Sequence, residues 1–176
     1  PLSLDSNDPA VLERAMRVYN GKPLINSVNG DDESMEKIFP LIKKYGGSVI
    51  ALTLDKHGIP ETAEDRVKIA QHILKKANEF GIPSKEIIFD PLALTIATGA
   101  ENADITLEAV DMLHSMNLKT SLGVSNISFG MPERDKINSA FFSLALSKGL
   151  SCAIMNPSSA SMMQTYRSFN GDAGCD

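Results

Sequence analysis

The feature that most constrains this chain is a strict alternation of short apolar runs with longer amphipathic segments, repeated six times along the sequence. Runs that are apolar on successive residues indicate strands buried on both faces. Strands that alternate with helices indicate a parallel sheet covered by helices. The alternation therefore predicts an α/β fold, but a doubly wound open sheet and a (β/α)8 barrel share this pattern. The predicted strands lie at about residues 2–4, 24–25, 48–54, 87–89, 120–124 and 152–155.

Several of the amphipathic segments carry signals for where a helix begins. Asp8 precedes a proline and Asp135 precedes an apolar pattern, so we expect both to cap helices. Residues 62–65 read as a capping box. Pro40 lies inside a helical pattern and should kink it. The helices after the first are expected over about residues 32–45, 62–80, 104–116, 135–148 and 159–169.

Composition excludes several classes of function. The 176 residues include 22 acidic and 17 basic side chains, a formal net charge of -5, which argues against a broad nucleic-acid surface. No apolar run approaches the ~18 residues of a membrane helix. Cys152 and Cys175 form no Cys-x-x-Cys pair, and the three histidines are scattered, so we expect no metal site. With no visible signal peptide, the expected location is cytoplasmic.

A polar side chain follows each of the six predicted strands. Because the carboxyl ends of parallel strands converge on the ligand site of α/β folds, these side chains should ring one mouth. Asp accepts hydrogen bonds and Asn both donates and accepts, which suits a polar, nitrogen-rich heterocycle better than an anion. Turn and cap chemistry is an open alternative at each position, and we favour it for Asp55. The six residues are Asp5, Asn26, Asp55, Asp90, Asn126 and Asn156.

Five ordered segments around these strand ends resemble the pterin-binding family of methyltetrahydrofolate methyltransferases. The most specific segment is Leu-Gly-Val-Ser-Asn-Ile-Ser-Phe-Gly-Met-Pro-Glu-Arg at 122–134. The likeness extends to about residue 170 and is greatest to the folate-binding domain of cobalamin-dependent methionine synthase. The other segments are Leu-Ser-Leu-Asp-Ser at 2–6, Leu-Ile-Asn-Ser at 24–27, Ile-Phe-Asp-Pro-Leu at 88–92 and Lys-Gly-Leu-Ser-Cys-Ala-Ile-Met-Asn-Pro at 148–157.

The resemblance implies a (β/α)8 TIM barrel of which this chain holds about six βα units. The first predicted strand matches the family's third, so the chain would supply barrel strands 3 to 8, and we expect two further units before Pro1. Residues 1–170 would form this partial pterin-binding domain and residues 171–176 a polar tail. Since six strands cannot close the barrel, the isolated piece is expected to be inactive.

The resemblance also implies a reaction and its residues. Asp5, Asn26 and Asp90 would hydrogen-bond the pterin ring of 5-methyltetrahydrofolate, and Arg134 would help to hold the substrate. Asn126 would lie near pterin N5, and with Asp90 it would serve catalysis. The N5 methyl group would pass to Co(I) of a cobalamin or other corrinoid on a partner domain or protein, with no metal held by this chain. The interpretation also allows a homodimer.

Three alternatives stay open at this point. A dihydropteroate synthase would share the pterin mouth, but that family carries Ser-Arg-Lys where this chain has Ser125-Asn126-Ile127. An enzyme that expels pyrophosphate should keep those cations. A corrinoid methyltransferase with another methyl donor would be favoured by loss of the Asp5, Asn26 and Asp90 set, which is present. The non-enzymatic alternative is a pterin-binding or docking fragment without turnover.

Overall fold

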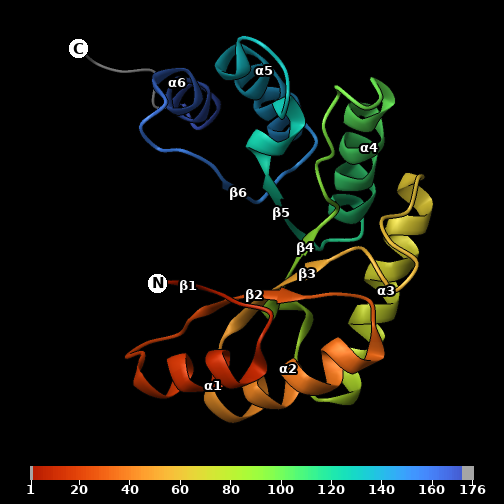
Figure 1. The fold of residues 1–176 in the computed structure, drawn as a ribbon, viewed down its shortest axis with the longest axis vertical. Helices are drawn as coiled ribbons and strands as arrows, with labels where there is room; N and C mark the ends of the chain where they lie inside the picture. The colour runs from red at the N-terminus through yellow and green to blue at the C-terminus, as the bar shows by residue number, and fades with distance from the viewer. Residues whose placement is uncertain (1, 172–176) are drawn as a thin grey trace.

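The computed structural model describes residues 2–171, which form a six-stranded parallel sheet that curls, with helices on its outer side (Figure 1). The strands lie side by side in chain order, and every neighbouring pair is parallel. All carboxyl ends therefore lie at one edge of the sheet. The strands are β1 (Ser3–Asp5), β2 (Leu24–Val28), β3 (Ser48–Leu52), β4 (Ile87–Asp90), β5 (Lys119–Gly123) and β6 (Cys152–Ile154).

Helices follow the strands in strict alternation, as predicted. Asp8 Oδ1 accepts a hydrogen bond from the Ala10 amide at 2.8 Å, which confirms its capping role. The expected cap at Asp135 is wrong, because α5 begins one residue earlier and places Asp135 inside its first turn. The helices are α1 (Pro9–Val18), α2 (Asp32–Tyr45), α3 (Ala63–Glu79), α4 (Glu101–Ser115), α5 (Arg134–Ser147) and α6 (Ala160–Phe169), with short 3-10 turns η1 (Ser84–Glu86) and η2 (Val124–Ser128).

Two apolar cores hold the helices against the sheet. The first lies among α1, α2, α3 and strands β2 to β4, and includes Phe39, whose ring meets Phe80 edge to face at 5.7 Å between centroids. The second joins α4, α5 and α6 to β5 and η2, and includes Phe141 and Phe142. Helix α2 continues through Pro40 to Tyr45, so the proline does not end the helix, and the Pro40 side chain is exposed. Within residues 2–171, no helix is both long and apolar enough to cross a membrane.

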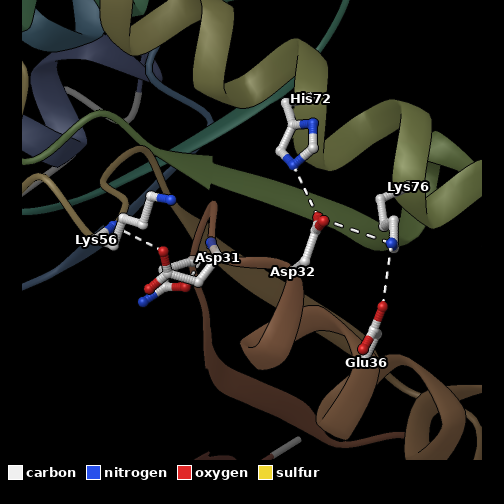
Figure 2. Close-up of polar contacts among 7 residues, drawn as sticks. Asp31, Asp32, Glu36, Lys56, His72 and Lys76 are labelled. Atoms are coloured by element: carbon white, nitrogen blue, oxygen red, sulfur yellow. Dashed lines mark hydrogen bonds and ion pairs between the residues drawn. The ribbon is translucent and has the colours of Figure 1, made fainter.

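Exposed ion pairs join α2 to α3 on the outer surface. Figure 2 shows the Asp32 carboxylate between two side chains of α3, with Oδ1 3.1 Å from His72 Nε2 and 3.7 Å from Lys76 Nζ. Lys76 Nζ also lies 3.3 Å from Glu36 Oε1, and this hydrogen bond raises the pKa of Lys76. Exposed pairs of this kind contribute about 1 kcal/mol or less. They align the two helices without adding much stability.

The observed architecture confirms the predicted α/β class and six strand-helix units. The sheet is part of a (β/α)8 barrel, since it is parallel, sequential in strand order and curled with the helices outside. The boundary predicted at residue 170 stays a prediction. Its polar tail lies, apart from Gly171, outside the described residues.

Candidate functional site

Asp5 is the last residue of β1, and Asn26 lies beside it within β2, which continues to Val28 and so does not end before Asn26 as predicted. The two residues are register partners, and Asn26 Nδ2 donates to Asp5 Oδ2 at 3.4 Å. Both line a cavity of about 280 Å³ on the inner face of the sheet, which Ser121 of β5 and Cys152 of β6 bound on the other side. After Asn26 the pairing of β2 with β3 shifts register, and the Asn26–Ser27 peptide bond is cis.

Asp90 ends β4 on the same inner face of the sheet. It lies two residues beyond Ile88, which lines the cavity, and alternate residues of a strand share a face. Its side chain is 7 % exposed. The main-chain oxygen accepts from the Thr53 amide at 3.0 Å, and carboxylate Oδ1 accepts from the Leu92 amide at 2.8 Å. Hydrogen bonds therefore hold both the main chain and the carboxylate of Asp90 at the end of β4.

Burial raises the pKa of the Asp90 carboxyl to about 6. Desolvation is the dominant cause, because an ionised carboxylate is disfavoured away from water. The Leu92 amide hydrogen bond and the positive charge of Arg66 both act in the opposite direction. Asp90 is therefore still mostly ionised at pH 7, and it gains a proton under mildly acidic conditions.

Asn126 is displayed at the mouth by the tight turn η2, which continues directly from β5. Its side chain is exposed, and its main-chain oxygen accepts from the Phe129 amide at 3.1 Å. A Cβ atom on Gly123 would lie only 3.0 Å from Asn126 Nδ2, so the absence of a side chain there gives the amide its room. The turn and this glycine together set where the Asn126 amide lies.

Arg134, the first residue of α5, binds the turn that carries Asn126. Its Nε donates to Ser128 Oγ at 3.0 Å, and Nη2 donates to the Ser125 main-chain oxygen at 2.9 Å. These contacts tie together both ends of η2. In this structure Arg134 thus holds the mouth loop in place, a connection that its sequence position alone does not predict.

The remaining strand-end side chains serve local turns. Asp55 Oδ1 accepts from the His57 amide at 2.8 Å, which confirms the turn interpretation, and Asn156 Oδ1 accepts from the Ser158 amide at 3.0 Å. Among the residues that the structure describes, no group of three or more His, Cys, Asp or Glu side chains could hold a metal ion. The site therefore consists of Asp5 and Asn26 at the cavity, Asp90 beyond them, and the η2 turn with Asn126 and Arg134.

Sequence reasoning missed one residue next to this site, Arg66 of α3. It is fully buried, and its guanidinium contacts the main chain just after Asp90. In the sequence, apolar residues at helical spacing begin at Val67, and this pattern gives no signal that the charged Arg66 is buried. The acceptors that allow its burial lie in loops distant in sequence, so only the three-dimensional structure could reveal it.

A curled parallel sheet with a polar cluster at the carboxyl ends of its strands defines the class of (β/α)8-barrel proteins with a ligand site at the mouth. Within that class, the chain belongs to the family of pterin binding enzymes, whose model matches residues 1–156.

Two named enzymes are similar to most of this chain. Over 172 residues the chain is 35 % identical to methionine synthase from Mycobacterium tuberculosis, and over 168 residues it is 30 % identical to methylcorrinoid:tetrahydrofolate methyltransferase from Eubacterium limosum. These alignments cover 90 % and 93 % of this chain. They span only 14 % of the mycobacterial protein and 62 % of the Eubacterium protein.

Solved structures agree on the fold. A dihydropteroate synthase from Thermus thermophilus superposes with a TM-score of 0.77 over 97 % of this chain and 70 % of its own. The enzyme from Xanthomonas albilineans, in complex with 7,8-dihydropteroate, gives a TM-score of 0.75 over 100 % of this chain and 70 % of its own. Sequence identities of 18 % and 16 % limit this likeness to the fold.

Proposed function

We propose that this chain binds 5-methyltetrahydrofolate and is the folate-binding part of a methyltransferase that exchanges the N5 methyl group with a corrinoid. The observation that carries the proposal is the convergence of Asp5, Asn26 and Asp90 on the inner face of one sheet edge. A pterin ring presents N–H donors beside ring-nitrogen and carbonyl acceptors. Two carboxylates and one amide match that pattern, because the carboxylates accept and the amide does both. The relative named as a methylcorrinoid:tetrahydrofolate methyltransferase supports a reaction of this kind, and the similarity to a methionine synthase is consistent with it.

In this proposal the chain's own residues orient the ring and manage the charge at N5. A tertiary amine is a poor leaving group until it carries positive charge, so N5 must gain a proton before or during transfer. Asn126 can present either its oxygen or its nitrogen, so it can support both protonation states of N5. Asp5 and Asp90 fix the ring and favour positive charge on it.

The corrinoid is supplied by another domain or protein, and its Co(I) centre is the methyl acceptor. Arg134 contributes by keeping η2, and with it Asn126, at the mouth while the partner approaches. The Eubacterium relative is named for the opposite direction, from methylcorrinoid to tetrahydrofolate. A site that supports both states of N5 serves either direction, and the relative energies of donor and acceptor decide which one runs.

The likeness in fold to dihydropteroate synthases makes pterin condensation the second candidate. That reaction expels pyrophosphate, and cations should neutralise the leaving group. The η2 turn has Asn126 and Ile127 after Ser125, and Met155, Asn156 and Pro157 follow β6, so neither segment carries a Lys or Arg of its own. The cation at η2, Arg134 of α5, is bonded to Ser125 and Ser128. A pterin pyrophosphate with p-aminobenzoate should therefore yield no condensed product, and turnover in that assay would establish the synthase function instead.

Binding to the intact natural protein tests the proposal. 5-Methyltetrahydrofolate should bind in titration calorimetry, and Asp5→Asn should weaken binding by about tenfold or more, because it removes a charged acceptor from the ring. Asp55→Asn is the matched control, since Asp55 serves a local turn and lies outside the cavity. Absence of binding by the wild-type protein at saturating ligand would contradict the proposal, as would equal losses in both variants.

A further inference from the structure

Arg66 is the largest fully buried side chain of the described residues. It lies in the first turn of α3, and burial lowers its pKa because the charged form loses hydration. A buried cation needs hydrogen-bond acceptors. Arg66 finds them in main-chain oxygens: Nε donates to Pro60 at 3.0 Å, and Nη1 donates to Pro91 at 2.8 Å and to Leu92 at 2.9 Å.

The last two of these oxygens belong to the turn that immediately follows Asp90. Leu92 has φ of 67°, in the left-handed region, which costs a non-glycine residue about 1 kcal/mol or more. This conformation directs the Leu92 amide to Asp90 Oδ1 at 2.8 Å, and the Leu92 oxygen accepts from Arg66. Thr106 Oγ1 lies 3.0 Å from the Leu92 oxygen and 2.8 Å from the Asn102 oxygen, and its one proton can be donated to either. Contacts from α3 and α4 thus hold Leu92 in the conformation that orients the Asp90 carboxylate.

We propose that Arg66 is a positioning residue for ligand recognition: it clamps the Pro91–Leu92 turn so that the Leu92 amide fixes one oxygen of Asp90 and leaves the other for the pterin. The inference rests on the proposed function of Asp90. It adds a requirement for a residue that does not touch the ligand, because Arg66 of α3 contacts the turn after β4 and affects Asp90 through that turn. Within residues 2–171, no donor is paired with Asp90 Oδ2, as this division of roles requires.

Charge adds a second effect of Arg66. Its positive charge lowers the pKa of Asp90 against the opposing effect of burial. The other group that acts on Asp90 is the Leu92 amide, and the Asp90 charge in turn adds to the effect of burial in raising the pKa of Cys152 on β6. Only the ionised carboxylate accepts hydrogen bonds with both oxygens. Loss of Arg66 should therefore raise the pKa of Asp90 above about 6 and shift pterin binding to higher pH.

Two readouts on the intact protein test this inference. The first is the pKa of the Asp90 carboxyl from carbon-13 NMR titration, which needs no ligand. The second is the affinity for 5-methyltetrahydrofolate between pH 5 and 8. We expect Arg66→Met to raise the pKa of Asp90 and to lower affinity at pH 7 by about tenfold. Arg66→Lys keeps the charge and should leave the pH midpoint in place while still weakening binding. Arg14→Met, on an exposed face of α1, is the control.

Thr106→Val keeps the experiment decisive if Arg66→Met does not fold. It removes a hydrogen-bond partner of the Leu92 oxygen at 3.0 Å and one of Arg66 Nη1 at 3.3 Å, and it leaves the arginine charge, so affinity should fall about threefold with an unchanged pH midpoint. A folded Arg66→Met protein with wild-type affinity and an unchanged Asp90 pKa would overturn the inference. A wild-type protein that binds no 5-methyltetrahydrofolate would instead overturn the proposed function, and the carboxyl titration would still decide whether Arg66 controls Asp90.

Discussion

At the scale of single residues, the buried carboxyl of Asp90 shows how this fold prepares a recognition group. Its side chain is 7 % exposed, and burial raises its pKa to about 6. The Leu92 amide satisfies one oxygen and the Arg66 charge favours ionisation. A group held like this is costly to the folded state and ready to accept hydrogen bonds from a ligand, the usual trade between stability and function.

Asp90→Asn should stabilise the protein at pH 7 and impair pterin binding. The folded pKa of about 6 lies above the ordinary 3.8, so the folded wild type binds more protons than the unfolded chain between these values. Its stability therefore falls as pH rises from about 4 to 6, and the neutral amide avoids that loss. Urea unfolding should show a gain of up to about 3 kcal/mol at pH 7 that largely disappears near pH 4. An equal gain at both pH values would contradict this account.

At the scale of elements, η2 depends on the helix that follows it. Arg134→Ala removes both hydrogen bonds to the turn, so we expect about 1–2 kcal/mol lower stability and slower methyl transfer, with a larger effect on kcat than on KM. Ser128→Ala should reproduce part of the loss, because it removes the partner of Arg134 Nε. Arg14→Ala serves as the control. If Ser128→Ala had no effect while Arg134→Ala raised KM alone, Arg134 would act on the substrate and not through the turn.

The same elements show what sequence can and cannot predict. The alternation of strands and helices was readable because burial on both faces makes the strands apolar, and the capping role of Asp8 follows from local chemistry. The strand-end positions of Asp5 and Asp90 were predictable for the same reason, whereas β2 continues two residues beyond Asn26. The burial of Arg66 was not, since its acceptors come from loops 6, 25 and 26 residues away. The cap expected at Asp135 failed because α5 starts one residue before it, after Glu133 in a left-handed conformation.

At the scale of the whole molecule, the curled sheet has two strands that are paired on one side only. Within the described residues these are β1 and β6, each three residues long. Apolar side chains lie exposed at both, Leu2 at 61 % and Ile154 at 48 %. An unpaired strand offers its N–H and C=O groups to another chain. In a closed barrel, further strands would pair with β1 and β6 and cover the cavity between them. The cavity that holds the candidate site is therefore the part of the molecule that depends most on closure of the barrel.

A polypeptide of only these 176 residues should therefore self-associate through its sheet edges. We expect its mass in light scattering after size exclusion to rise with concentration, and Ile154→Lys to reduce that rise, since an inward-facing charge at an edge strand opposes edge-to-edge pairing. Val18→Lys is the matched control, because Val18 is 69 % exposed but lies at the end of α1, on the helical layer. An equal reduction in both variants would assign the association to apolar surface in general, and a monomer at every concentration would show that the open edges are tolerated. The edge-pairing account requires the difference between the two lysine variants, because only one of them changes a strand.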